Sequence, residues 1–153
     1  MNKIIDVTGK GIFYLDKAGE FIPQLGLRLL ITWEFWESGL QKLNGDNWFA
    51  DLQTDFPFPF NLAPVALSWF LATWIEVLGS IAITLGLGTR FFAFSFIILD
   101  LVAWYSVHAG SGYNVCSNGF KLPLIYLIML LPLLFVGPGK ASIDFLIKKH
   151  FIK

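Results

Sequence analysis

Five charged side chains lie within long apolar stretches of this 153-residue sequence: Arg28, Glu34, Glu37, Glu76 and Asp100. Charged groups are unfavourable inside a bilayer, and those that occur there usually line an ion path, a proton relay or a ligand pocket. Four carboxylates and one guanidinium cannot all be ionised in a low dielectric, so some of the acids are expected to be protonated. These five residues are the predicted buried polar network.

Helix geometry indicates how this network is arranged. At about 100° per residue, Glu34 and Glu37 share one face of a helix, whereas Arg28 lies on another. Glu76 lies on a face of small and hydroxyl residues, which membrane helices use for close packing, so it is the expected partner of Arg28. Asp100 has apolar neighbours at helical spacing and is expected to be protonated or to face a cavity. Two interpretations stay open: a hydrogen-bonded network that fixes helix register, or a site for a proton, a metal ion or a ligand head group.

His108 and Cys116 form a second candidate site, in a glycine-rich loop. An imidazole and a thiolate are suitable ligands for Cu(I), so the pair is a candidate metal site, and a free surface cysteine beside a helix-end histidine is the alternative. The other histidine, His150, lies in the C-terminal tail, so a bis-histidine haem within one chain is not expected. The sequence has no phosphate loop, nucleophile elbow or zinc-binding helix motif, and an enzymatic activity of its own is not expected.

Composition limits the class of protein that could carry these sites. The chain is 56% hydrophobic and 14% charged, and its 11 Lys and Arg balance its 11 Asp and Glu. Soluble domains carry about 25% charged residues. A disordered tail, a nucleic-acid binder and an ordinary cytosolic enzyme are therefore excluded. The whole chain, residues 1–153, is interpreted as a single integral membrane domain.

Four stretches are long enough to position these residues within a membrane, since a crossing takes about 20 helical residues. They are residues 22–43, 62–87, 90–108 and 119–136. The first is the most polar, so its charged residues must face other helices. An all-α, integral membrane four-helix bundle is predicted. The aromatic loop at residues 44–64 is expected to be an interfacial cap or a lid over a cavity.

Lys and Arg are distributed unevenly around these stretches. Only Lys42 and Lys121 lie at the margins of the two loops that follow the first and third stretches. The remaining segments carry eight: Lys3, Lys10, Lys17, Arg90, Lys140, Lys148, Lys149 and Lys153. Positive residues concentrate on the cytoplasmic side, so both termini are predicted to be cytoplasmic in a multi-pass protein of the bacterial inner membrane.

The pattern resembles the DoxX family of small four-helix membrane proteins. The resemblance rests on Arg28-Leu29-Leu30, Ser38-Gly39-Leu40-Gln41-Lys42-Leu43, Glu76-Val77-Leu78-Gly79, Leu85-Gly86-Leu87-Gly88-Thr89-Arg90 and Gly137-Pro138-Gly139 with Ser142 and Asp144. A narrower set is similar to the HvfX branch of that family. It comprises Trp33-Glu34-Phe35-Trp36-Glu37-Ser38-Gly39, Asn47-Trp48-Phe49-Ala50-Asp51, Phe56-Pro57-Phe58-Pro59-Phe60, Ser68-Trp69-Phe70-Leu71-Ala72-Thr73-Trp74, Asn114-Val115-Cys116 and Gly119-Phe120-Lys121-Leu122-Pro123.

The narrower resemblance implies an accessory protein for the maturation or export of copper-binding, ribosomally made modified peptides. Its partners would be such a peptide or its maturation proteins. The wider resemblance implies an alternative, because the family takes its name from a thiosulfate:quinone oxidoreductase: a non-haem membrane subunit of a quinone-linked enzyme. A structural membrane scaffold is the third alternative. The cofactor therefore stays open between copper and a quinone. The lipid bilayer is an expected partner, a homo- or hetero-oligomer stays open, and nucleic acid is not expected.

Overall fold

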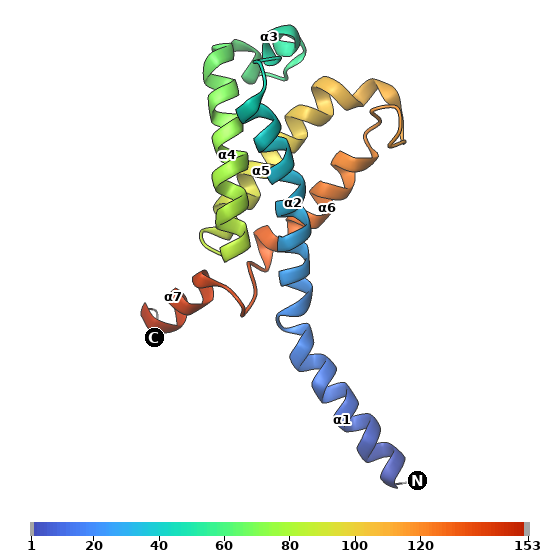
Figure 1. Cartoon of the computed structure of the whole chain (residues 1–153). Helices are drawn as coiled ribbons and strands as arrows, with labels where there is room; N and C mark the ends of the chain where they lie inside the picture. Colours follow the sequence, from blue (N-terminus) through green and yellow to red (C-terminus); the bar gives the residue numbers. More distant parts are fainter. Residues whose placement is uncertain (1, 152–153) are drawn as a thin grey trace.

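The computed structural model describes residues 2–151, and this part of the chain consists of helices joined by turns and loops, with no strand (Figure 1). The all-α prediction is confirmed. The longer helices are α1 (Asn2–Gly19), α2 (Ile22–Asn44), α4 (Val65–Leu85), α5 (Thr89–Ala103) and α6 (Lys121–Phe135). The shorter ones are α3 (Phe49–Leu52) and α7 (Ile143–Phe151).

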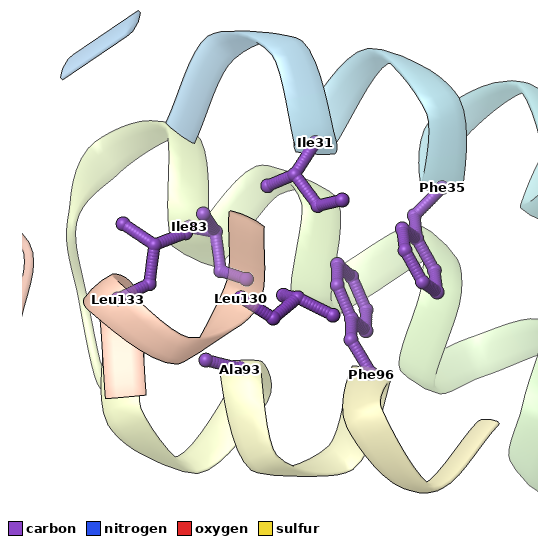
Figure 2. Packing of buried hydrophobic residues seen from close by; sticks show 7 residues of the cluster. All are labelled: Ile31, Phe35, Ile83, Ala93, Phe96, Leu130 and Leu133. Atoms are coloured by element: carbon purple, nitrogen blue, oxygen red, sulfur yellow. The ribbon is translucent and has the colours of Figure 1, made fainter. Parts of the chain in front are cut away.

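Helices α2, α4, α5 and α6 pack around a common apolar core. α2 contacts α4 and α6, and α5 contacts the same two helices. Figure 2 shows the core side chains, which come from all four: Ile31, Phe35, Ile83, Ala93, Phe96, Leu130 and Leu133. The rings of Phe35 and Phe96 stack with their centroids 3.9 Å apart and therefore join α2 to α5.

Two helices are long and apolar enough to cross a membrane, Val65–Leu85 and Thr89–Ser111. The second comprises α5 and its continuation through a π-helical segment, Trp104–His108, and a short 3-10 turn. α2 has 23 residues but carries several charges, and α6 is apolar but has 15 residues. That α2 and α6 also cross the membrane stays a prediction.

The link between α4 and α5 is short because glycines permit a tight turn. Gly86 and Gly88 have φ angles of +69° and +58°, a left-handed conformation that glycine adopts without strain. A Cβ atom at Gly86 would lie 2.4 Å from Cβ of Ser142. The Asp144 carboxylate accepts hydrogen bonds from the backbone N–H groups of Gly88 and Thr89, at 2.8 and 3.0 Å, and so caps α5.

The aromatic loop between α2 and α4 folds back onto α4. Phe49 makes edge-to-face contacts with Trp69 and Phe56, with centroids 5.0 and 5.2 Å apart, and Trp48 contacts Trp69 in the same way. This loop lies at one end of the packed helices, whereas α1 and α7 both lie at the opposite end (Figure 1). We call these the α3 end and the α7 end.

Candidate functional site

Arg28 lies near the α7 end and is 1% exposed. Its Nε donates a hydrogen bond to the carbonyl oxygen of Ile83 at 2.8 Å, and Nη2 donates to that of Thr84. Nη1 donates to the carbonyl oxygens of Ala141 at 2.6 Å and Pro138 at 3.1 Å. The guanidinium therefore joins α2, the last turn of α4 and the segment that follows α6.

The predicted pairing of Arg28 with Glu76 is wrong, and the register of α2 against α4 explains why. A Cβ atom at Gly39 would lie 3.1 Å from Cβ of Glu76, so these two positions face each other. Arg28 lies three turns closer to the start of α2, about 16 Å away at 1.5 Å per residue. The helical face was inferred correctly, but helical angles alone do not give the depth at which two antiparallel helices meet.

The partner of Glu76 is Lys42, and both residues are buried, with 5% and 8% exposure. Lys42 Nζ lies 2.9 Å from Oε1 and 2.8 Å from Oε2 of Glu76. The ammonium also donates to Ser38 Oγ at 2.7 Å, and Ser38 Oγ lies 3.3 Å from Glu76 Oε1. Sequence reasoning missed this pair because it placed Lys42 at the margin of a loop. Gly39, a small residue on the same face as Lys42, was the available signal of a close helix contact.

Glu34 is half-buried on α2 and accepts a hydrogen bond of 2.6 Å from the hydroxyl of Tyr126 on α6. Tyr126 was missed because residues 119–136 were interpreted only as an apolar span. Glu37 is exposed on the chain surface. Asp100 on α5 is 6% exposed, and its Oδ2 has no hydrogen-bond partner among residues 2–151.

Two cavities adjoin the Lys42–Glu76 pair. The first, here called the acidic cavity, has a volume of about 580 Å³ and contains all four predicted acids in its wall. The second, here called the apolar cavity, has a volume of about 440 Å³. Six residues line both cavities, so the ion pair forms part of the wall between them: Lys42, Trp48, Glu76, Leu99, Ala103 and Val107.

The walls of the apolar cavity come from α4, α5 and the aromatic loop. The loop contributes Trp48, Phe49, Phe56 and Phe60, and the two helices contribute mostly aliphatic side chains. Its polar groups are the ion pair and three serines, Ser68, Ser95 and Ser106. A space of this size and composition suits an apolar molecule with one polar end.

The five residues of the predicted network thus divide into two groups. Glu34, Glu37, Glu76 and Asp100 line one cavity, and Lys42 and Tyr126 join them there. Arg28 is absent from that wall and holds backbone carbonyls near the α7 end.

The candidate copper ligands lie at the α3 end. His108 Nδ1 is 2.7 Å from the carbonyl oxygen of Asn118, and Cys116 is an exposed free thiol. Within residues 2–151, no group of three or more His, Cys, Asp or Glu side chains is placed to hold a metal ion. Copper binding by His108 and Cys116 stays a prediction.

An all-helical chain with two membrane-length apolar helices and charged residues inside it is of the membrane type. The chain belongs to the DoxX family, whose profile matches residues 24–109 and so includes α2, α4 and α5. It is 54% identical over 137 residues to a Haemophilus influenzae protein described as uncharacterized, covering 90% of this chain and 91% of that relative. A second H. influenzae protein with the same description is 37% identical over 73 residues, or 46% of this chain and 54% of the relative. No solved structure gives a significant match.

Proposed function

We propose that the protein is a multi-pass protein of the bacterial inner membrane, in which α2, α4, α5 and α6 cross the bilayer as a four-helix bundle with both termini in the cytoplasm. The distribution of Lys and Arg supports this orientation. The position of α1 and α7 at one end supports an even number of crossings (Figure 1). Arg28 and Lys42 make α2 compatible with lipid, because both cations are buried and hydrogen-bonded within the protein.

This orientation is tested with fusions. Green fluorescent protein fused after residue 153 should fluoresce, and alkaline phosphatase at the same place should be inactive. Alkaline phosphatase inserted after Asp46, in the loop between α2 and α4, should be active. The reverse pattern would show the opposite orientation. Equal activities at both positions would place them on the same side and contradict the three proposed crossings, α4, α5 and α6, between them.

For this membrane protein we propose the binding of a neutral amphipathic molecule of the quinone class, as the non-haem membrane subunit of a quinone-linked oxidoreductase. The observation that carries the proposal is the apolar cavity, which is lined by aromatic and aliphatic side chains and ends at the Lys42–Glu76 pair. Its volume of about 440 Å³ falls within the range of about 300–1,000 Å³ usual for small-molecule sites.

The charge of the cavity favours a neutral ligand. Lys42 and Glu76 neutralise each other, so a ligand with a net charge would have no counter-ion there. A quinone presents carbonyl oxygens that accept hydrogen bonds, and in this wall the Ser68 hydroxyl is a donor with no acceptor among the described residues. The hydroxyls of Ser95 and Ser106 donate to backbone carbonyls, and the Lys42 ammonium donates to Ser38 and Glu76. The prenyl tail of a quinone matches the apolar walls and partitions from the bilayer.

Neighbouring residues on α5 provide a matched pair of variants. Val102 lines the apolar cavity, whereas Leu101 is 47% exposed and lines none of the cavities described above. Val102→Phe should weaken the binding of decylubiquinone to the detergent-purified protein at least tenfold, because the added ring fills the cavity. Leu101→Phe should bind like the parent. Equal binding by both variants, or no binding by the parent, would refute the assignment.

The resemblance to the HvfX branch supports a second proposal, a role in a pathway of copper-binding peptides, and the thiol of Cys116 near the α3 end is the residue that motivates it. Deletion of the gene should then alter copper tolerance or peptide localisation. Copper titration of Cys116→Ser against the parent tests the ligand pair, and unchanged binding would remove it. A purely structural scaffold, alone or in an oligomer, is distinguished by Val102→Phe, because filling the apolar cavity would remove the function of a binding site at normal abundance and leave that of a scaffold unchanged.

A further inference from the structure

The acidic cavity contains more negative than positive groups. Glu34, Glu37, Glu76 and Asp100 line it, and the Lys42 ammonium is already held by Glu76. Tyr126 donates a hydrogen bond to Glu34, but its hydroxyl is uncharged and adds no positive charge to the cavity. His108 also lines the cavity, and its Nδ1 lies against the carbonyl oxygen of Asn118. The cavity is therefore complementary to a cation.

Asp100 provides an independent indication of a ligand. The side chain is buried, with 6% exposure, and it lies in the wall of the acidic cavity. Its Oδ2 has no hydrogen-bond partner within residues 2–151. A buried carboxyl oxygen without a donor is unfavourable, and such atoms are rare in folded proteins. A positively charged ligand in the cavity would compensate the charge of this carboxyl group, whose residue lines the wall.

The dimensions of the site favour an organic cation over a metal ion. Among the described residues, no three His, Cys, Asp or Glu side chains are close enough to hold a metal ion together. The cavity of about 580 Å³ has room for an organic molecule that reaches carboxylates on different helices. Phe35, Trp48 and Tyr126 add aromatic rings to its wall, and aromatic rings attract organic cations.

We propose that the acidic cavity binds an organic cation of small-molecule size, a substituted ammonium or guanidinium, with Asp100 as its main counter-ion. Glu34 and Glu37 on α2 contribute the remaining negative potential. The site is separate from the proposed quinone site, because Val102 lines only the apolar cavity and Asp100 lines only the acidic one.

The test uses the full-length protein in detergent, with radiolabelled tetraphenylphosphonium as the probe and tetraphenylborate as an anion of the same shape. The parent should bind the cation in preference to the anion. Asp100→Asn should bind it at least tenfold more weakly. Asp46→Asn, a matched change at an exposed acid outside the cavity, should bind like the parent. A smaller cation, phenyltrimethylammonium, should displace the label from the parent.

A second variant covers a failure of Asp100→Asn to fold. Glu37 lines the cavity but is exposed, so Glu37→Gln should fold normally and still bind the cation several-fold more weakly. The proposal is overturned if the parent binds neither cation, if it binds the anion as well as the cation, or if Glu37→Gln and a folded Asp100→Asn both bind like the parent. None of these results depends on whether decylubiquinone binds.

Discussion

Removal of the Lys42 ammonium should destabilise the protein strongly, because it leaves a buried carboxylate without its partner. The side chains of Lys42 and Glu76 are 9% and 7% exposed, and Nζ lies 2.8 Å from Oε2. Breaking a buried ion pair by removing one partner lowers the free energy of unfolding by about 3–5 kcal/mol. Lys42→Met keeps the length of the side chain and removes its charge, so this range applies to it.

The chain contains a matched control for burial. Lys140 and Glu20 form an ion pair near the α7 end, but their side chains are 53% and 48% exposed. Exposed pairs contribute about 0–1 kcal/mol, since water screens both charges. Lys140→Met should therefore change the free energy of unfolding by less than about 1 kcal/mol, although it also removes one lysine from an ion pair.

The assay is denaturant unfolding of the purified protein in detergent, followed by tryptophan fluorescence. The double variant Lys42→Met/Glu76→Gln removes both charges and should recover about 2 kcal/mol or more relative to Lys42→Met alone. Equal losses for Lys42→Met and Lys140→Met would refute the interpretation of a buried pair. A double variant that is less stable than Lys42→Met would show that the unpaired Glu76 charge is not the source of the loss.

Three further changes test separate contacts. Arg28→Lys replaces a guanidinium that reaches four carbonyl oxygens with a group of three donors, and should lower the free energy of unfolding by about 2 kcal/mol or more, measured by the same titration. Tyr126→Phe removes the hydrogen bond to Glu34 and should cost about 0.5–1.5 kcal/mol, whereas no change would mean that water replaces it. A Cβ atom at Gly39 would lie 2.9 Å from Cγ2 of Val77, so Gly39→Ala should push α2 away from α4 and lower the midpoint of thermal unfolding. An unchanged midpoint would contradict this close approach of the two helices.

The helical elements could be predicted from apolar run length, since the predicted stretch 62–87 contains α4 and the stretch 90–108 contains all of α5 except its first residue, Thr89. The outer part of the third stretch was less predictable. Residues 104–108 form a π-helical segment, which depends on a locally inserted residue in the hydrogen-bond ladder and leaves no mark in hydrophobic periodicity. The aromatic loop was expected to be a cap or a lid, and its packing on Trp69 could be known only from the structure.

The sequence predicts which types of residue line the candidate site, but it does not predict which side chains pair with each other. The four acids that the sequence places within apolar stretches line one cavity, and their functional role stays a prediction. Lys42 and Tyr126 were missed for a physical reason. Which side chains meet depends on how far one helix is shifted along its axis against its antiparallel neighbour, and neither composition nor helical periodicity gives that shift. Asp100 and Glu34 line the same cavity because α2 and α5 both pack on α4 and α6 and meet at the stack of Phe35 on Phe96. These are tertiary contacts between segments far apart in the sequence.

The two ends of the helices are held together by different contacts. Near the α7 end, Arg28 and Asp144 bond the helix ends and the segment after α6 together, and Ile83 is fully buried beside them. Toward the α3 end, α5 continues as the π-helical segment, and the helices there line the apolar and the acidic cavity. Another cavity, lined by Arg90 and Lys148 among others, lies at the α7 end, so it is the buried Lys42–Glu76 pair in the shared wall that sets the two cavities of this half apart. A ligand in either cavity would contact Lys42 and Glu76, while the hydrogen bonds of Arg28 and Asp144 at the α7 end hold the helices in register.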